Sequence, residues 1–273
     1  MTDRELDIVI PSYNNSGILS RCLMALEQGA PGRHRVLVVD DGSGPEHRAR
    51  VADVIASLDR DAQVLTHDVN KGFKEAILTA MRFSTARYVL LLNDDTVPTA
   101  DFDLKLLEAI HGDHQTRAVG PVSNHPTDLF QYRPELRSIA SDGSIDPARL
   151  AARFEERRRE QGTTEVPFLT GMCLLLDRNV FEQAGYFDGA YEHGYFEDLE
   201  LCCRLRAMGH RLQVREDCFV YHVGHETYKH KATEEKHRII MRNFGIYEAA
   251  WSHLPEHQEL LRRMEYAGQE HPI

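Results

Sequence analysis

The segment Tyr88-Val-Leu-Leu-Leu-Asn-Asp-Asp-Thr-Val-Pro98 joins a continuous apolar run to two neighbouring carboxylates. Val89 to Leu92 predicts a strand covered on both faces, because its apolar residues are continuous rather than alternating. Two adjacent acids at the end of such a strand repel each other and are costly to desolvate. A solvated acidic turn would tolerate them, whereas a site for a hard divalent cation would need them. The rest of the chain distinguishes these two interpretations.

The composition is that of a folded globular protein, with 273 residues of which 42% are hydrophobic and 27% charged. This length allows one large domain, or a core with a small extension. The formal net charge of -11 argues against unaided binding to nucleic acid or to anionic lipid. We therefore expect no nucleic-acid partner. A nucleotide could still bind through a metal ion, which supplies the missing positive charge.

The cysteines and the lengths of the apolar runs indicate in which cellular compartment the protein is expected. The five cysteines include no Cys-x-x-Cys pair, which predicts buried free thiols in a reducing environment. The first seven residues are charged and lack the apolar core of a secretory leader. No run of eighteen apolar residues occurs, so we expect no membrane span, although peripheral membrane association would still fit. We expect a cytoplasmic protein, and the sequence carries no signal for a particular oligomeric state.

Short apolar segments alternate with helical patterns over the first 120 residues. The apolar segments are Ile8–Ile10, Val36–Val39, Val64–Thr66, Val89–Leu92 and Ala118–Gly120, and the helical patterns are Gly17–Gln28, Pro45–Leu58, Gly72–Phe83 and Phe102–His111. This alternation predicts an α/β fold, a Rossmann-like and mostly parallel sheet with helices on both faces.

Polar residues follow four of the predicted strands. They are Pro11-Ser-Tyr-Asn14, Asp40-Asp-Gly-Ser43, His67-Asp68 and Asn93-Asp-Asp95. Ligands of open parallel sheets bind at the carboxyl ends of the strands, where these residues converge. The Asp94-Asp95 pair is therefore one part of a polar edge, which favours a binding site over an ordinary acidic turn.

The remainder of the chain departs from this alternation. Pro121–Val166 is polar and contains an arginine-rich helical stretch, Pro147–Gln161, which we interpret as a solvated surface helix or, alternatively, as a flap beside the site. Phe168–Leu176 predicts a strand. Tyr195–Arg206 predicts a helix with an acidic first turn, where the helix dipole favours negative charge. Thr233–Trp251 predicts an amphipathic C-terminal helix.

Several common site motifs are absent from the sequence. Gly42-Ser-Gly44 lacks the third glycine of a dinucleotide-binding fingerprint, because residue 47 is His. No phosphate-binding Gly-x4-Gly-Lys-Ser/Thr loop occurs, and no Cys/His quartet has the spacing of a zinc site.

Seven short motifs occur in an order that is characteristic of one enzyme family. They are Ile8-Val-Ile-Pro-Ser-Tyr-Asn14, Val38-Val-Asp-Asp-Gly-Ser43, Asn70-Lys-Gly72, Leu92-Asn-Asp-Asp95, Thr170-Gly171, Gly185-Tyr-Phe-Asp188 and Glu197-Asp-Leu-Glu-Leu201. The series resembles the family-2 inverting glycosyltransferases with the GT-A fold, over about Ile8 to His225. The resemblance implies a nucleotide-sugar-binding half (1–122), an acceptor-binding and catalytic half of the same GT-A domain (123–230), and a C-terminal helical extension on the acceptor side (231–273).

The resemblance also implies a nucleoside-diphosphate sugar as donor, with UDP or dTDP favoured. The implied donor contacts are Pro11, Tyr13, Asn14, Asp40, Asp41, Asn70, Gly72, Asn93 and Asp94. The implied cofactor is Mg²⁺ or Mn²⁺, with Asp95 as the main ligand, His222 as a further ligand and His225 as a weaker candidate. A hard cation takes oxygen ligands and bridges the two phosphates of such a donor.

The implied chemistry is a single in-line displacement at the anomeric carbon. Asp198 matches the family's general base, which takes the proton of the acceptor hydroxyl, and Glu197 would orient it or raise its pKa. Gly171 and Glu200 are the implied acceptor contacts. The acceptor would be a glycan, a lipid-linked glycan or a small molecule.

Two departures from the family pattern and two alternatives accompany this interpretation. Asn93 replaces the first acid of the family's metal motif, and Ile77-Leu78 replaces an Arg-Asn pair found in many relatives. One alternative is a catalytically inactive nucleotide-sugar-binding partner protein of the same fold. The other is a sugar-phosphate nucleotidyltransferase, which would need a glycine-rich N-terminal loop where Pro11-Ser-Tyr-Asn14 stands.

Overall fold

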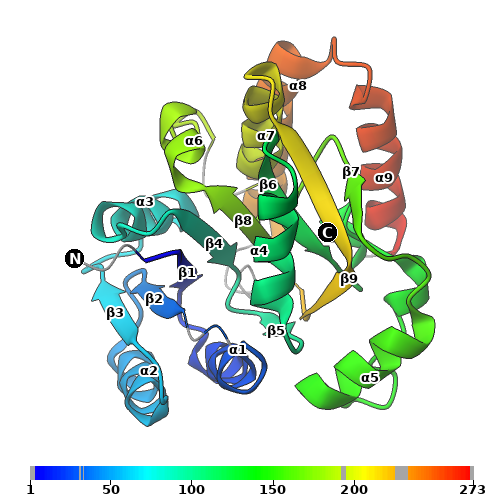
Figure 1. The fold of residues 1–273 in the computed structure, drawn as a ribbon. Coiled ribbons are helices and arrows are strands. Elements are labelled where there is room, and N and C mark those ends of the chain that lie inside the picture. The colour runs from blue at the N-terminus through cyan, green and yellow to red at the C-terminus, as the bar shows by residue number, and fades with distance from the viewer. Residues whose placement is uncertain (1–3, 31, 33, 192–194, 225–232, 271–273) are drawn as a thin grey trace.

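The structure is a computed structural model that describes residues 4–30, 32, 34–191, 195–224 and 233–270. Its described elements form a mixed sheet that is covered by helices (Figure 1). The strands are β1 (Leu6–Ser12), β2 (Arg35–Asp40), β3 (Ala62–Thr66), β4 (Tyr88–Leu92), β5 (Thr96–Pro98), β6 (Thr116–Val122), β7 (Thr163–Glu165), β8 (Cys173–Asp177) and β9 (Arg211–His222).

The strand order is β3-β2-β1-β4-β8-β6-β9-β5, with the short β7 paired to β9. The strands β3, β2, β1 and β4 are parallel, and β6 is parallel to β9. β8 runs antiparallel between β4 and β6, while β5 and β7 pair antiparallel with β9. The longer strands other than β8 therefore point the same way, as the alternation of elements predicted.

The helices pack on both faces of this sheet. They are α1 (Ser16–Gly29), α2 (Pro45–Ser57), α3 (Phe73–Phe83), α4 (Phe102–Gly112), α5 (Pro147–Arg157), α6 (Arg178–Gln183), α7 (Glu197–Ala207), α8 (Thr233–Trp251) and α9 (His257–Glu270), with short 3₁₀ helices η1 (Pro126–Asp128) and η2 (Pro134–Leu136). In Figure 1 the C-terminal helices α8 and α9 lie near α7 and away from α1 and α2.

The side chains of β4 explain why its apolar run is continuous. Val89 and Leu91 belong to one core cluster, which includes residues of α3 and α7. Leu90 and Leu92 belong to a second cluster, which includes residues of α1 and α4. Since successive side chains of a strand point to opposite faces, a strand covered on both faces needs apolar residues at every position. The prediction from the opening segment is confirmed.

Three predicted boundaries are wrong, one of them that of the helix predicted over Tyr195–Arg206, which begins at Glu197. The predicted strand Phe168–Leu176 begins only at Cys173, because the backbone N–H of Thr170 donates to the side-chain oxygen of Gln131 at 2.7 Å and no sheet bond forms there. The arginine-rich helix ends at Arg157 rather than Gln161. Its side chains pair within the chain, as Arg153 does with Asp142, which agrees with a surface helix.

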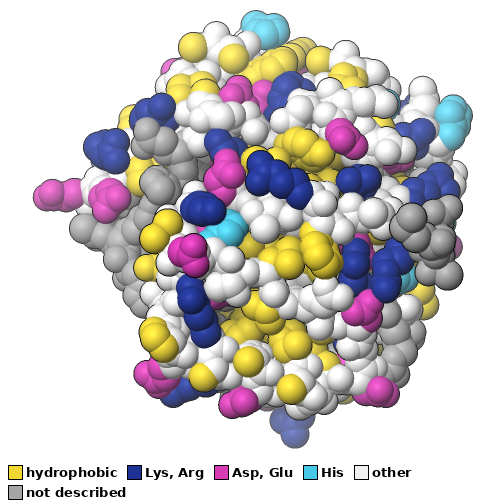
Figure 2. All heavy atoms as spheres, turned by 90° about the vertical axis from the view of Figure 1, so that its left-hand side faces the viewer, with side chains coloured by type: hydrophobic (Ala, Val, Ile, Leu, Met, Phe, Trp, Pro, Cys, Tyr) yellow, Lys and Arg dark blue, Asp and Glu magenta, His cyan; other side chains and the backbone are white. Residues whose placement is uncertain are grey.

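Other expectations about the chain agree with the structure. All five cysteines are buried and free. Among the described residues, no helix has the length and apolar content required to cross a membrane. Figure 2 faces the side on which β3 and α3 lie in Figure 1, and its described surface intersperses acidic and basic side chains with hydrophobic patches.

Candidate active site

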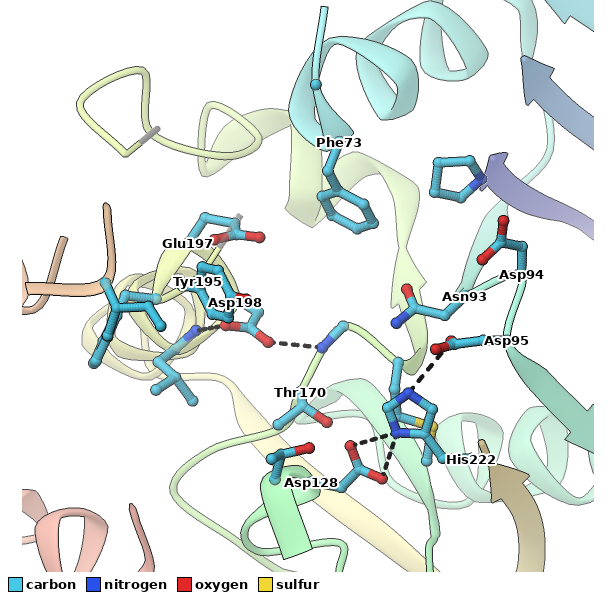
Figure 3. Close-up of a pocket in the computed structure, with 18 of the residues that line it drawn as sticks. Phe73, Asn93, Asp94, Asp95, Asp128, Thr170, Tyr195, Glu197, Asp198 and His222 are labelled. Carbon is cyan, nitrogen blue, oxygen red and sulfur yellow. Dashed lines mark hydrogen bonds and ion pairs between the residues drawn. The ribbon is translucent and has the colours of Figure 1, made fainter. Parts of the chain in front are cut away.

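A cavity of about 580 Å³ opens at the carboxyl ends of β1 and β4 and reaches α7, α8 and α9 (Figure 3). Most of the site residues predicted from the sequence line it. They are Pro11, Tyr13, Asp41, Asn70, Gly72, Asn93, Asp94, Asp95, Gly171, Glu197, Asp198 and His222. The structure thus brings together residues more than 200 positions apart in the chain, at the sheet edge where ligands of α/β proteins bind.

Three predicted residues do not line the cavity. The side-chain oxygen of Asn14 accepts the backbone N–H at the start of α2 at 2.9 Å. Asp40 forms an ion pair with Arg48 at 2.8 Å, and Glu200 forms one with Arg204 at 2.7 Å. Asn14 and Asp40 therefore shape the loop behind the site, and the side chain of Glu200 is paired with Arg204 within α7.

Asp41 fixes the turn that carries two of the predicted donor contacts. Its carboxylate accepts the backbone N–H groups of Lys71 and Gly72 at 2.8 and 2.7 Å, and it lies 2.7 Å from Nδ1 of His67. Gly72 has a φ of 89°, a left-handed conformation that a residue without a Cβ adopts at little cost. The sequence Asn70-Lys-Gly72 is thus a turn built around one buried acid.

The two carboxylates after β4 have different partners. Asp94 and Asp95 are 1% and 2% exposed, so neither lies on a solvated turn. Asp94 accepts the hydroxyl of Ser12 at 2.7 Å. Oδ1 of Asp95 lies 3.3 Å from Nε2 of His222, which comes from the end of β9 (Figure 3). The predicted metal ligands Asp95 and His222 are therefore neighbours, while His225 lies outside the described residues.

Asp128, which sequence reasoning missed, holds the other side of the His222 ring. Both oxygens of Asp128 lie 3.0 Å from Nδ1 of His222, and the hydroxyl of Ser123 donates to Asp128. Burial alone would lower the pKa of His222, but the facing carboxylates of Asp128 and Asp95 raise it well above its usual value. No motif could have revealed Asp128, because it lies 94 residues from its partner within a polar, irregular segment.

The donors around Asp95 fit a hard divalent cation. Carboxylate oxygen suits Mg²⁺ and Mn²⁺, imidazole is a common ligand, and a carboxylate on the far ring nitrogen is the usual partner of a metal-binding histidine. No ready-made group of three or more metal-binding side chains occurs within the described ranges. The set therefore fits an ion that binds through one or two carboxylates together with the phosphates of a substrate.

Asp198 is held from two sides at the start of α7. Its Oδ2 accepts the N–H of Gly171 and its Oδ1 accepts the N–H of Leu199, both at 2.8 Å. Burial raises the pKa of Asp198, while these two hydrogen bonds counteract the rise. Gly171, predicted as an acceptor contact, thus orients the predicted base in this structure.

Glu197 differs from its neighbour in having an oxygen that is not hydrogen-bonded. Its Oε2 is buried and has no hydrogen-bond partner among the described residues, and the residue is one of those that line the cavity. Burial and the adjacent charge of Asp198 raise the pKa of Glu197 to about 8. A carboxyl group that keeps its proton near neutral pH can donate a hydrogen bond to a ligand.

This raised pKa predicts a pH-dependent stability. Because folding raises the pKa of Glu197 from 4.5 to about 8, the folded chain holds this proton more tightly than the unfolded chain. The free energy of unfolding should therefore fall as pH rises through this window. At pH 8.5 the free energy of unfolding of Glu197→Gln should exceed that of wild type by on the order of 1–3 kcal/mol, so the variant should melt at a higher temperature, and the gain should shrink towards pH 5.

Thermal melts of both proteins across this pH range measure the effect. The exposed Asp188, changed to Asn, is the control for removing one acid from the same region. A Glu197→Gln variant whose gain is the same at pH 5 and pH 8.5 would contradict the burial of an ionisable group at this position.

The family of the chain follows from its match to a family model. Residues 7–185, from β1 to the loop after α6, match the model described as glycosyl transferase family 2. The chain belongs to glycosyl transferase family 2. The matched segment includes Asp94 and Asp95 as well as Gly171.

Several bacterial proteins resemble this family 2 chain. An N-acetylglucosaminyltransferase of Rhizobium meliloti (strain 1021) is 37% identical over 236 residues, which cover 82% of this chain and 52% of that protein. One of Bradyrhizobium diazoefficiens is 32% identical over 266 residues, covering 92% and 51%. The pre-mycofactocin glycosyltransferase of Mycobacterium tuberculosis (strain ATCC 25618 / H37Rv) is 27% identical over 220 residues, covering 80% and 43%. The chain thus spans about half the length of these relatives.

Solved structures share the fold of the family 2 chain. A mannosyltransferase from Pyrobaculum calidifontis, in complex with GDP-Man and Mn²⁺, superposes with a TM-score of 0.67 at 17% identity, covering 97% of this chain and 70% of that one. GalNAc-T7 with UDP, GalNAc and Mn²⁺ gives a TM-score of 0.65 at 14% identity, covering 99% and 55%. The predicted GT-A fold is confirmed.

The turn that precedes α7 in this family 2 chain is strained and is held by the C-terminal region. Tyr195 and Phe196 have left-handed φ values of 69° and 71°, which cost roughly 1–3 kcal/mol each in residues other than glycine. The side chain of Asn243, on α8, donates to the carbonyl of Tyr195 at 3.0 Å. The ring of Phe196 lies 5.6 Å from those of Phe244 and Tyr247, also on α8. Helix α8 therefore fixes the backbone just ahead of Glu197 and Asp198.

Proposed function

We propose that the chain is a metal-assisted inverting glycosyltransferase that moves a sugar from a nucleoside-diphosphate sugar to an acceptor hydroxyl. One observation carries this proposal. Asp95 and His222, whose side chains are common metal ligands, lie on one side of the cavity. The carboxylate of Asp198 lies on the opposite side (Figure 3). In this proposal residues 1–122 bind the donor, residues 123–230 bind the acceptor and catalyse, and residues 231–273 complete the acceptor side.

On the donor side, Asp95 and His222 would hold Mg²⁺ or Mn²⁺, with Asp94 nearby. A bound ion would offset the charge that grows on the leaving diphosphate. Two structures of the same fold contain Mn²⁺ together with a nucleotide or nucleotide sugar, which supports this assignment.

On the acceptor side, Asp198 would take the proton of the attacking hydroxyl. The N–H groups of Gly171 and Leu199 hold both of its oxygens in a fixed orientation, and a carboxylate can accept further hydrogen bonds beyond these two. One base on the face opposite the leaving group suffices for a displacement that inverts the anomeric carbon.

Asp128 should determine how well His222 binds the ion. Asp128→Asn keeps the shape of the side chain but removes the charge that faces Nδ1 of His222. We expect the affinity for Mn²⁺ to fall by roughly 10–100-fold, the usual cost of losing such a partner. Calorimetric titration of Mn²⁺ in the presence of UDP measures it, with the exposed Asp53→Asn as a control for the loss of one charge. Equal Mn²⁺ affinity in both variants would show that Asp128 does not support metal binding by His222.

The nucleotide should be UDP or dTDP rather than CDP. The carboxylate of Asp41 contacts His67, Lys71 and Gly72, and among the described residues its Oδ2 accepts only the N–H of Gly72, which leaves a lone pair for an imide N–H. Uracil and thymine carry this donor and cytosine does not. UDP should bind more tightly than CDP by ~1–3 kcal/mol in calorimetry with Mn²⁺. Equal affinities for UDP and CDP would rule out base recognition by Asp41.

The products released separate this function from its alternatives. The protein is incubated with a panel of nucleotide sugars, Mn²⁺ and a mixture of acceptors. An inverting glycosyltransferase releases free nucleoside diphosphate and forms a glycosylated product with the opposite anomeric configuration, whereas a product with the same configuration would contradict the single displacement. Release of pyrophosphate would indicate a nucleotidyltransferase, and binding of nucleotide with no product would indicate an inactive binding protein.

A further inference from the structure

The two sides of the cavity differ in chemistry. The donor side presents polar groups at the ends of β1, β2 and β4, such as Ser12, Asp41 and Asn93. The other side is built largely by apolar side chains of α3, α7, α8, α9 and the residue after η1. This apolar wall consists of Phe73, Leu129, Leu199, Ile240, Met264 and Ala267.

The apolar wall reaches the proposed base. A Cβ placed on Gly171 would lie 3.8 Å from both the ring tip of Phe73 and Oδ2 of Asp198, so the ring and the carboxylate flank the same residue. Leu199 directly follows Asp198 in α7. A group attached to the reacting hydroxyl must therefore occupy space next to apolar side chains.

Polar side chains on this side are few and mostly engaged elsewhere. The hydroxyl of Thr170 donates to Gln131, that of Thr127 lies 2.7 Å from His125, and Asp128 faces His222. Among the described residues that line this side, Glu197 has a buried oxygen without a hydrogen-bond partner, Glu235 is exposed, and Asp198 accepts only backbone N–H groups, those of Gly171 and Leu199. A sugar unit here would lose water from several hydroxyls and gain few hydrogen bonds.

Glu197 and Asp198 together match a single hydroxyl. The proposed base accepts the proton of that hydroxyl, and Glu197, which precedes it in the chain and also lines the cavity, supplies a second carboxyl group on this side. One hydroxyl uses both groups, whereas a polyol would need more.

Resting on the proposed function, we propose that the acceptor is a compact apolar molecule, such as an aryl alcohol, whose single reacting hydroxyl meets Asp198 while its apolar part packs on the apolar wall. The wall is closed by α9, which is anchored near the cavity because Arg263 donates to the carbonyl of Leu129 at 3.2 Å and lies over the ring of Phe130. An anchored helix favours a compact group over a long chain.

Binding tests this proposal without requiring turnover. Calorimetry compares 2-phenylethanol, 1-dodecanol below its micellar range and cellobiose, each with and without UDP and Mn²⁺. We expect 2-phenylethanol to bind at least about tenfold more tightly than cellobiose, a modest ratio for an apolar site. Binding of cellobiose more tightly than 2-phenylethanol would overturn the proposal. Binding of 1-dodecanol more tightly than 2-phenylethanol would also contradict it, because the acceptor would then carry a long alkyl chain rather than a compact group.

Two variants locate the binding. Met264→Gln keeps the size of the side chain but adds a polar end. It should lower the affinity for 2-phenylethanol by roughly tenfold. Gly268→Phe should abolish binding by filling space, because a Cβ there meets nothing within 4 Å. Met241→Gln is the matched control, since Met241 is 51% exposed on α8 and does not line the cavity. Unchanged binding in both cavity variants would contradict the proposal.

Failure of the proposed function gives a different result. If UDP binds with Mn²⁺ and no nucleotide sugar yields free diphosphate, the catalytic assignment is wrong whatever the alcohols do. If diphosphate is released and transferred to cellobiose but not to 2-phenylethanol, the function stands and the acceptor class proposed here is wrong.

Discussion

Replacing Asp198 by Asn should reduce the rate of sugar transfer by roughly 10²–10⁴-fold, the range that general-base catalysis supplies. The amide has the size of the carboxylate but cannot take a proton at neutral pH. Because the proposed role of Asp198 concerns the acceptor and not the donor, the affinity for UDP with Mn²⁺ should stay near that of wild type. Single-turnover transfer and calorimetry of UDP measure the two effects separately.

The hydrogen bonds of Asp198 require a folding control in this experiment. Asn presents an NH₂ group to one of the two backbone N–H groups that the carboxylate now accepts. The melting temperature of the variant must therefore be compared with that of wild type, and Asp188→Asn serves as a matched control on an exposed acid. If a folded Asp198→Asn protein transfers sugar within a few-fold of wild type, Asp198 is not the base, and Glu197, which also lines the cavity, is the next candidate.

Asp95→Ala should remove the dependence of UDP binding on Mn²⁺. In wild type we expect Mn²⁺ to strengthen UDP binding by several kcal/mol, which is on the order of 10²–10³-fold. Asp95 is buried, but its loss leaves His222 paired with Asp128, so the end of β9 keeps a partner. Titrations of UDP at increasing Mn²⁺ measure the effect.

The comparison variant for this experiment is Asp94→Asn. Asp94 accepts the hydroxyl of Ser12, a bond that an amide oxygen preserves, so this variant should retain much of the dependence on Mn²⁺. An Asp95→Ala protein whose UDP affinity still rises with Mn²⁺ as in wild type would show that the ion binds elsewhere.

The elements that could be predicted from the sequence are those whose structure depends on residues close together in the chain. The strand at Val89–Leu92 and the acids after it follow from an apolar run and from the rule that ligands bind at strand ends. Helix α8 could likewise be predicted over Thr233–Trp251 from its amphipathic pattern.

The features that were missed depend on contacts between distant residues. The loop at Phe168–Met172 replaces a predicted strand because Gln131 and Asp198 bind its backbone, and neither interaction has a local signal. Asp128 is identified as a site residue by its contact with His222, which the sequence does not reveal. The strand β9, which supplies His222, was not predicted.

The left-handed turn at Tyr195–Phe196 limits how this protein can be altered by exchange of parts. The turn stores strain directly ahead of the proposed base, and α8 restrains it through Asn243. A chimera that replaced α8 to obtain a different acceptor would therefore also release the backbone that positions Asp198. In the proposed function, acceptor range and catalytic competence would be linked through this contact, so a recombined protein would have to carry Tyr195-Phe196 and α8 across as one block.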